Sequence, residues 1–258
     1  MIFHLRFFFN FMKRKDINQN LLLIDIGNSQ IKYAESKSGN IGKVFFIPQS
    51  KVNTVQKVKK IISLYKNHKV LISSVLDINL EAKIKPDVYI SSKTRLPFSL
   101  NYKGNFGNDR KSSLSGAMAL SKNKNILVVD FGTATTYNFL SDKKFKGGMI
   151  TTGLHLSANA LTQNTSLKPD LKKFKKGFLA DSTDKNILNG LINQQLFMFY
   201  KTVDIIKADF KKLKIFITGG NSQIMKNFID KKYVFEFREN LVLTGLIKLY
   251  NLNYENHN

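Results

Sequence analysis

The chain has 258 residues, of which 43% are hydrophobic, so it is long enough for one large domain or two ordinary ones. It contains no cysteine, which excludes a disulfide framework, a thiolate metal site and a cysteine nucleophile. The formal net charge of +23 invites a nucleic-acid partner. The lysines, however, are spread along the whole chain as singles and pairs, as an AT-rich genome would produce. We therefore expect no nucleic-acid partner.

The first twenty residues differ in composition from the rest. Phenylalanines cluster at positions 7–9 and 11, and three basic residues follow at 13–15. This apolar run is too short to span a membrane and has no small-residue cleavage site. We expect residues 1–20 to be an extension outside the folded domains, either disordered or upstream of a true start at Met12. No other stretch reads as a transmembrane helix, so we expect no membrane partner and a cytoplasmic location.

The first half of the chain predicts three strands joined by tight turns, followed by alternating helices and strands. Strands are predicted at residues 21–26, 30–36, 43–48, 69–75 and 88–91. Apolar residues at helical spacing predict a helix over 52–65, and a short segment ending near Pro86 separates the last two strands. A polar stretch after Pro97 leads into a helix expected to begin at Asp109, with a small-residue face for close packing.

The second half repeats this order after a boundary placed near residue 121. Its strands are predicted from 126 and at 136–141, 145–150, 214–218 and 233–238. Its helices are predicted at 154–161, 183–207, from 221, and at 241–252. The repeated order is typical of duplicated ribonuclease H-like domains, as in actin-like ATPases. We expect a first domain at 21–121 and a second at 122–258. Each should hold a five-stranded mixed sheet with flanking helices, with a cleft between the two domains.

The same polar pattern follows a buried strand in both halves. The first copy is Asp25-Ile-Gly27 and the second is Asp130-Phe-Gly132, each followed by hydroxyl or amide residues. Glycine allows a tight turn, and the free amides and hydroxyls of such a turn can cradle phosphate oxygens. The aspartate can hold a cation that neutralises phosphate charge. Two ordinary hairpins with polar turns are the alternative, but two matched copies favour a polyphosphate site.

Four segments together resemble the type III pantothenate kinases, also called the Bvg accessory factor family. The segments are residues 25–32, the Gly-Asn-Asp-Arg motif at 107–110, residues 130–136, and the Gly-Gly segment at 147–153. Thr183 and the Thr-Gly-Gly turn at 218–220 also fall where that family has them. The resemblance covers residues 21–252, and the order of the motifs is more specific than any one of them.

This resemblance implies ATP-dependent phosphorylation of pantothenate, the first step of coenzyme A synthesis. It also implies a homodimer, Mg²⁺ with the nucleotide, and a monovalent cation, K⁺ or NH₄⁺, beside it. Asp109 is then the general base and Asp130 the monovalent-cation ligand. The implied pantothenate contacts are Tyr102, Gly107, Asn108, Asp109, Arg110 and Thr183. The implied ATP contacts are Asp25, Ile26, Gly27, Asn28, Ser29, Gln30, Ile31, Lys32 and Thr133.

Three positions depart from the family pattern. Asn138 stands where the family usually has Asp, Thr152 replaces a Pro, and Thr244 stands where Glu is common. Local alternatives also exist, because Asp109 could simply cap a helix, and so could Thr183.

Two other functions are compatible with parts of the sequence: a non-catalytic transcription-accessory protein of the same family, and another small actin-like kinase. The chain has no helix-turn-helix, RRM or zinc pattern. The three aspartates at 25, 109 and 130 are all present, so we expect an active pantothenate kinase.

Overall fold

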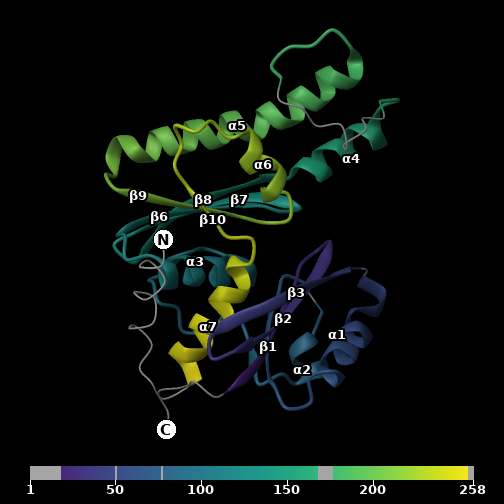
Figure 1. Cartoon of the computed structure of the whole chain (residues 1–258), viewed down its shortest axis with the longest axis vertical. Helices are drawn as coiled ribbons and strands as arrows, with labels where there is room; N and C mark the ends of the chain where they lie inside the picture. The colour runs from purple at the N-terminus through teal and green to yellow at the C-terminus, as the bar shows by residue number, and fades with distance from the viewer. Residues whose placement is uncertain (1–18, 50, 77, 168–176, 255–258) are drawn as a thin grey trace, which may run out of the picture.

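The protein folds around two five-stranded mixed sheets of identical topology (Figure 1). The computed structural model describes residues 19–49, 51–76, 78–167 and 177–254, and the elements below belong to these residues. The first sheet has the order β3-β2-β1-β4-β5 and the second β10-β9-β6-β7-β8. In each, the central strand pairs antiparallel with the strand that follows it and parallel with the fourth strand of its half. The predicted duplicated fold is confirmed.

The strands lie close to their predicted positions. The first sheet contains β1 (Asn20–Ile26), β2 (Gln30–Lys37), β3 (Asn40–Pro48), β4 (Lys69–Ser74) and β5 (Val88–Tyr89). The second contains β6 (Asn125–Phe131), β7 (Ala134–Ser141), β8 (Lys144–Thr152), β9 (Leu213–Thr218) and β10 (Glu236–Phe237). The helices are η2 (Lys51–Asn53), α1 (Thr54–Ser63), α2 (Leu80–Ile84), α3 (Asn108–Leu120), α4 (Leu154–Asn164), α5 (Thr183–Asp209), α6 (Ser222–Phe228) and α7 (Leu241–Tyr254).

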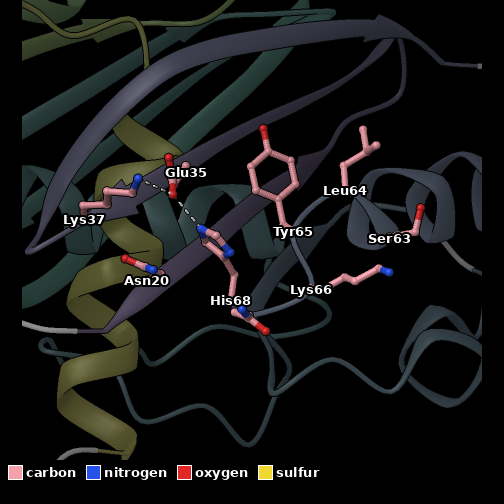
Figure 2. Close-up of a pocket in the computed structure, with 9 residues that line it drawn as sticks. Asn20, Glu35, Lys37, Ser63, Leu64, Tyr65, Lys66 and His68 are labelled. Carbon is pink, nitrogen blue, oxygen red and sulfur yellow. Dashed lines mark hydrogen bonds and ion pairs between the residues drawn. The ribbon is translucent and has the colours of Figure 1, made fainter.

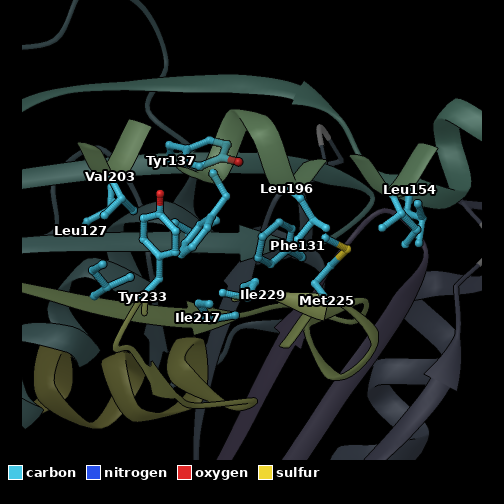
Figure 3. Close-up of a cluster of buried hydrophobic side chains, with 14 of the residues drawn as sticks. Leu127, Phe131, Tyr137, Leu154, Leu196, Val203, Ile217, Met225, Ile229 and Tyr233 are labelled. Atoms are coloured by element: carbon cyan, nitrogen blue, oxygen red, sulfur yellow. The ribbon is translucent and has the colours of Figure 1, made fainter. Parts of the chain in front are cut away.

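The central strands are apolar on both faces because helices cover both faces of each sheet. In β1, Leu22 and Ile24 pack toward Val58 of α1, whereas Leu21 and Leu23 pack toward α7. In the second sheet, one face packs on α5 and α6, where Phe131, Leu196 and Met225 lie together (Figure 3). This alternation follows the two-residue period of a strand, and it fixes the register that brings Asp25 and Asp130 to equivalent places.

Two helices lie between the sheets, and each packs on the sheet of the other half of the sequence (Figure 1). Leu114 and Ala117 of α3 join a core with strands of the second sheet. Leu246 and Leu249 of α7, the last element, join the core of the first sheet. Helix pair α3–α7 crosses closely, since a Cβ added at Gly245 would overlap the Ser112 carbonyl oxygen. The two halves are therefore interlocked.

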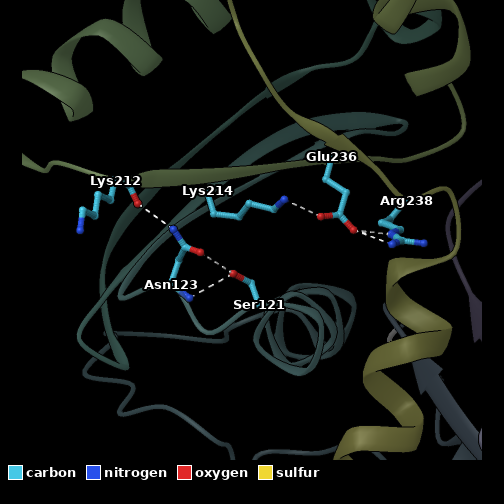
Figure 4. A network of polar contacts seen from close by, with 6 residues as sticks. All are labelled: Ser121, Asn123, Lys212, Lys214, Glu236 and Arg238. Atoms are coloured by element: carbon cyan, nitrogen blue, oxygen red, sulfur yellow. Dashed lines mark hydrogen bonds and ion pairs between the residues drawn. The ribbon is translucent and has the colours of Figure 1, made fainter. Parts of the chain in front are cut away.

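Two groups of polar contacts lie beside the second sheet: one ties the chain after α3 to Lys212, just before β9, and the other ties β9 to β10 (Figure 4). The Asn123 Nδ2 donates a hydrogen bond to the Lys212 carbonyl oxygen at 3.0 Å, and the Asn123 Oδ1 accepts one from the Ser121 hydroxyl. Glu236 of β10 pairs with Lys214 and Arg238, each at 2.6 Å. These contacts fix the edge of the sheet that β10 forms.

The last predicted strand is shorter than expected. We predict a strand over residues 233–238, but β10 covers only Glu236–Phe237. Tyr233 turns into the core, where its ring stacks on Tyr200 with centroids 4.6 Å apart, and its backbone N–H bonds to the Asp230 carbonyl. At the other end of the chain, β1 begins at Asn20, whereas residues 1–18 of the predicted extension lie outside the described residues. None of the described helices is long and apolar enough to cross a membrane.

Candidate active site

The two Asp-x-Gly segments form equivalent hairpin turns. Asp25 is opposite Lys32 in the β1–β2 pair, and Asp130 is opposite Thr136 in the β6–β7 pair. In the first turn the Gly27 N–H donates to the Gln30 carbonyl at 3.0 Å; in the second the Gly132 N–H donates to the Ala134 carbonyl at 3.2 Å. Ile26 and Ile31 are buried beside the first turn, and Asn28 and Ser29 are exposed on it. The sequence repeat is thus a structural repeat.

The two turns meet each other directly. The Ser29 hydroxyl lies 2.7 Å from the Thr133 hydroxyl, although the residues belong to different sheets. A third turn, Gly219-Gly220 after β9, closes on the same place. Gly219 has φ +99, and a Cβ there would overlap the Asp130 carboxylate. Three glycine turns that carry hydroxyl groups and backbone amides therefore surround one point, which is the kind of surface that binds phosphate groups.

Three carboxylates face this point, and their surroundings disfavour the charged form. Burial raises the pKa of Asp25 to about 7; the Lys32 ammonium opposes this, and the charges of Asp109 and Asp130 add to it. Burial likewise raises the pKa of Asp130 to about 7, with the Asp109 charge adding and Lys32 opposing. Burial also raises the pKa of Asp109. Cations that bind beside such a group favour its ionised form.

Asp109 lies in the first turn of α3, where Gly107 is the N-cap residue. Its Oδ1 accepts the backbone N–H of Arg110 at 2.7 Å. The capping alternative is therefore partly true, since the carboxylate does satisfy a free N–H of the helix start. A carboxylate has about four sites that can accept a hydrogen bond, so Asp109 retains acceptor capacity for a substrate proton.

Arg110 is buried in an aromatic box. Its guanidinium lies 4.0 Å from the Phe106 ring centroid, 5.4 Å from Tyr102 and 5.8 Å from Phe145. Its Nε donates to the Asn138 Oδ1 at 2.7 Å, and its Nη2 lies over Gly148. These contacts orient the planar fork while its terminal nitrogens have no carboxylate partner in the described part of the chain. An oriented, uncompensated guanidinium suits an anionic ligand.

Two residues predicted to contact pantothenate, Asn108 and Thr183, are placed differently from the other predicted site residues. Asn108 uses its side chain within the protein, since Nδ2 donates to the Ser74 carbonyl and Oδ1 accepts from Lys111. Thr183 is exposed at the first position of α5. Gln195, twelve positions further along α5, touches the second hairpin through Thr135 at 2.8 Å. At about 1.5 Å per residue, Thr183 lies about 18 Å beyond that contact.

The oxygen atoms at this site are of the kind that bind cations. Asp25 Oδ1 is buried and has no hydrogen-bond partner within the described residues, so one carboxylate oxygen is left for a ligand. Carboxylate and carbonyl oxygens are the ligands that Mg²⁺ and K⁺ accept. The aspartates do not form a closed cage, because the described residues contain no group of three acidic or imidazole side chains close enough to hold a metal alone. Phosphate oxygens and water would complete the coordination.

The surface hollow of Figure 2 is separate from this site. It is lined by residues that include Glu35, Tyr65 and His68, at the ends of β1 and β4 opposite to Asp25. Glu35 accepts from His68 at 2.7 Å and pairs with Lys37 at 3.0 Å. Its carboxylate is thus already satisfied, and the hollow takes no part in the site described above.

Sequence reasoning missed several residues that shape the site. Phe106 and Phe145 form the box, and the Asn221 Nδ2 holds the second hairpin by donating to the Gly132 carbonyl at 3.1 Å. For Phe106, a usable signal was its place directly before the Gly-Asn-Asp-Arg motif. Phe145 lies far from that motif in the sequence, and no local pattern links them.

The three departures from the family pattern have local partners. Asn138 accepts from Arg110 and donates to the Thr136 hydroxyl at 3.0 Å. The Thr152 hydroxyl bonds the Ser157 hydroxyl at 2.7 Å, and the Thr244 hydroxyl donates to the Asn240 carbonyl. All three side chains therefore take part in hydrogen bonds within the protein.

Two sheets of one topology, each with an Asp-x-Gly turn after its central strand, define the class of actin-like folds. Solved structures share this fold: a Campylobacter jejuni protein described as a Baf family transcriptional activator is 19% identical with a TM-score of 0.62, and covers 90% of this chain and 98% of that one. Component A of the Acidaminococcus fermentans (R)-2-hydroxyglutaryl-CoA dehydratase is 12% identical with a TM-score of 0.58, covering 93% and 99%.

Sequence comparison then gives the family. The family model for type III pantothenate kinase matches residues 21–204. The type III pantothenate kinase of Fusobacterium nucleatum is 32% identical over 267 residues, covering 89% of this chain and 98% of the relative. That of Thermosipho africanus is 27% identical over 246 residues, with 89% and 98% covered. The chain belongs to the type III pantothenate kinase family.

Proposed function

We propose that this protein transfers the γ-phosphoryl group of ATP to the primary hydroxyl of pantothenate, giving 4′-phosphopantothenate and ADP. The observation that carries this proposal is the convergence of two phosphate-type hairpins and the Asp109 carboxylate on one point. Phosphoryl transfer depends on positioning and charge neutralisation more than on covalent chemistry, and this point supplies both.

Each group has a role that its surroundings support. Asp109 accepts the hydroxyl proton as the oxygen attacks phosphorus, and the bond to the ADP oxygen breaks. The amides and hydroxyls of the 25–32 turn and Thr133 hold the phosphates, and Lys32 adds a positive charge. Arg110 binds the pantothenate carboxylate with its free fork, and the exposed Tyr102 ring borders it. Gly107 leaves room for the Asp109 carboxylate at the start of α3, since a Cβ at Gly107 would lie 2.5 Å from Asp109 Oδ1.

Asp25 and Asp130 would hold the cations. Asp25 has the unpartnered carboxylate oxygen that suits Mg²⁺ on the nucleotide, and Asp130 lies beside the backbone of the Gly219 turn, which suits K⁺ or NH₄⁺. These ions would neutralise the charge that builds up on the transferred phosphoryl group. Their binding would also return both carboxyl groups to the ionised form.

We further propose that the protein acts as a homodimer through the outer face of α5. Phe197 of α5 is 52% exposed, and Phe178 and Leu179, which precede that helix in the sequence, are 67% and 83% exposed. The Phe178 and Phe197 rings lie 6.2 Å apart and so form one apolar patch. Exposed patches of this kind mark protein interfaces. Thr183, close to this patch in sequence, remains a proposed pantothenate contact.

The direct test is ADP release by purified protein with ATP and Mg²⁺, with and without pantothenate, in potassium and then in sodium buffer. We expect turnover that requires pantothenate and potassium, and a loss of at least about a hundredfold in Asp109→Asn. Asp142→Asn is the matched control: Asp142 is a surface residue in an ion pair with Lys124, and asparagine tolerates its left-handed φ of 48. Folded protein without pantothenate-dependent turnover in any buffer would refute the proposed function.

A further inference from the structure

Lys111 is a buried lysine one residue beyond the substrate motif. It is 5% exposed, and its ammonium donates to the Ser91 carbonyl at 3.0 Å and to the Asn108 Oδ1 at 2.9 Å. Among the described residues no carboxylate forms a salt bridge with it, and burial alone lowers its pKa. Burying a cation without an acidic partner is unfavourable. A position that retains such a group therefore calls for an explanation beyond packing.

The two contacts of Lys111 belong to a longer chain of hydrogen bonds. Asn108 extends the network, since its Nδ2 donates a hydrogen bond to the Ser74 carbonyl at 3.1 Å. Ser74 is the last residue of β4, and Ser91 follows β5. The network thus joins the first turn of α3 to the ends of two neighbouring parallel strands of the first sheet. These are the strand ends on the same side as Asp25, because Asp25 pairs with Ser73 in the β1–β4 ladder.

The opposite side of the same helical turn is tied to the second sheet. Arg110 reaches Asn138 of β7 and the Phe145 ring of β8. Asp109 lies between these two anchors, with Asn108 and Lys111 holding one sheet and Arg110 holding the other. Both sheets contribute phosphate turns, so the place of Asp109 relative to both turns depends on both anchors.

We propose that Lys111 is a positioning residue that sets the place of Asp109 by fixing Asn108 and the start of α3 to the first sheet. This inference rests on the proposed function for its kinetic consequence, but the anchoring itself does not. A displacement of the base by about 1 Å can cost up to about a hundredfold in rate. The ATP turns lie outside the network, so ATP binding should remain.

The test compares Lys111→Met, which keeps the length of the side chain but removes its donors, with the wild type. We expect kcat per folded molecule to fall about 10- to 100-fold with the KM for ATP unchanged. Lys111→Arg, which keeps a cationic donor, should retain more activity than Lys111→Met. Lys59→Met, at an exposed position of α1, should change nothing. In an Asn108→Ala background, Lys111→Met should cost little more, because both residues act in one network.

Amide hydrogen exchange over residues 108–112 gives a readout independent of activity. Lys111→Met should speed exchange in this first turn of α3 and leave the hairpin turns unaffected. If the wild type lacks turnover, the proposed function fails, and exchange alone decides the anchoring. A folded Lys111→Met protein with kcat within about twofold of the wild type and unchanged exchange would overturn the proposal. A lower melting temperature with unchanged kcat would also overturn it, because that result indicates packing alone.

Discussion

Single residues at this site have properties set by their surroundings. Asp25, Asp109 and Asp130 are ordinary carboxylates in the sequence, yet burial and mutual repulsion raise the pKa of Asp25 and Asp130 to about 7. Arg110 is fixed by three rings and one amide. In the proposed function, binding of ATP and its cations would offset the energetic cost of holding these charges away from water.

The raised pKa of Asp109 has a consequence for the pH dependence of turnover. A general base acts in its ionised form, and burial raises its pKa, so ionisation is lost at a higher pH than for an ordinary aspartate. We expect kcat/KM for pantothenate to fall as pH decreases, with the midpoint above the ordinary value of 3.8. Steady-state rates between about pH 3.5 and about pH 8 would show this, with circular dichroism as the check on folding. An acid limb at or below the ordinary value would contradict the assignment.

Replacing Arg110 tests whether its fork recognises the substrate anion. Lysine keeps the charge in Arg110→Lys but cannot stack in the aromatic box or donate from two nitrogens in one plane. We expect the KM for pantothenate to rise about tenfold or more, while the KM for ATP stays constant. Arg238→Lys, at a surface position where Arg238 pairs with Glu236, is the control. An unchanged KM for pantothenate would remove Arg110 from the substrate site.

At the scale of elements, the α3–α7 crossing holds the halves together. Gly116 and Gly245 let the two helix backbones touch: a Cβ at Gly116 would overlap the Leu241 carbonyl, and one at Gly245 the Ser112 carbonyl. Such contact leaves no room for a side chain, so the two helices must separate if either glycine is enlarged. Separation would also shift the start of α3, where Asp109 lies.

Gly245→Ala should therefore destabilise the protein by about 1–3 kcal/mol, despite the better helix propensity of alanine. The measurement is urea unfolding followed by circular dichroism. Thr244→Ala, one residue earlier in α7, adds no volume and should change stability by less than about 0.5 kcal/mol. Equal stability of Gly245→Ala and wild type would show that the crossing is looser than the structure indicates.

The predictability of these elements follows from the range of the interactions behind them. Buried strands and Asp-x-Gly turns are local, so the sequence predicts both hairpins correctly. Tyr233 departs from its strand because Tyr200, more than thirty residues away, offers a stacking partner. Phe145 and Asn138 likewise contact Arg110 although both are distant from it in the sequence. Contacts between distant residues leave no periodic pattern, so this part of the site could not be predicted.

At the scale of the whole molecule, the proposed dimer face can be tested by one charge. Phe197→Asp places a carboxylate in the apolar patch with Phe178, so association should weaken and the mass in solution should fall to that of one chain. Analytical ultracentrifugation measures this directly. Val234→Asp, at another strongly exposed apolar position (80%), is the control and should not change the mass. A Phe197→Asp protein of unchanged mass would place the interface elsewhere.

The packing of α7 on the first sheet also governs how the chain can fold during synthesis. Leu21, Leu23 and Leu71 are made early, but their partners Leu246 and Leu249 are made only after all the strands of the second sheet. The first sheet must wait with one face uncovered until α7 has been made, and such distant pairing slows folding. A chain that stops before residue 241 would therefore fail in its N-terminal half, where the polypeptide itself is intact.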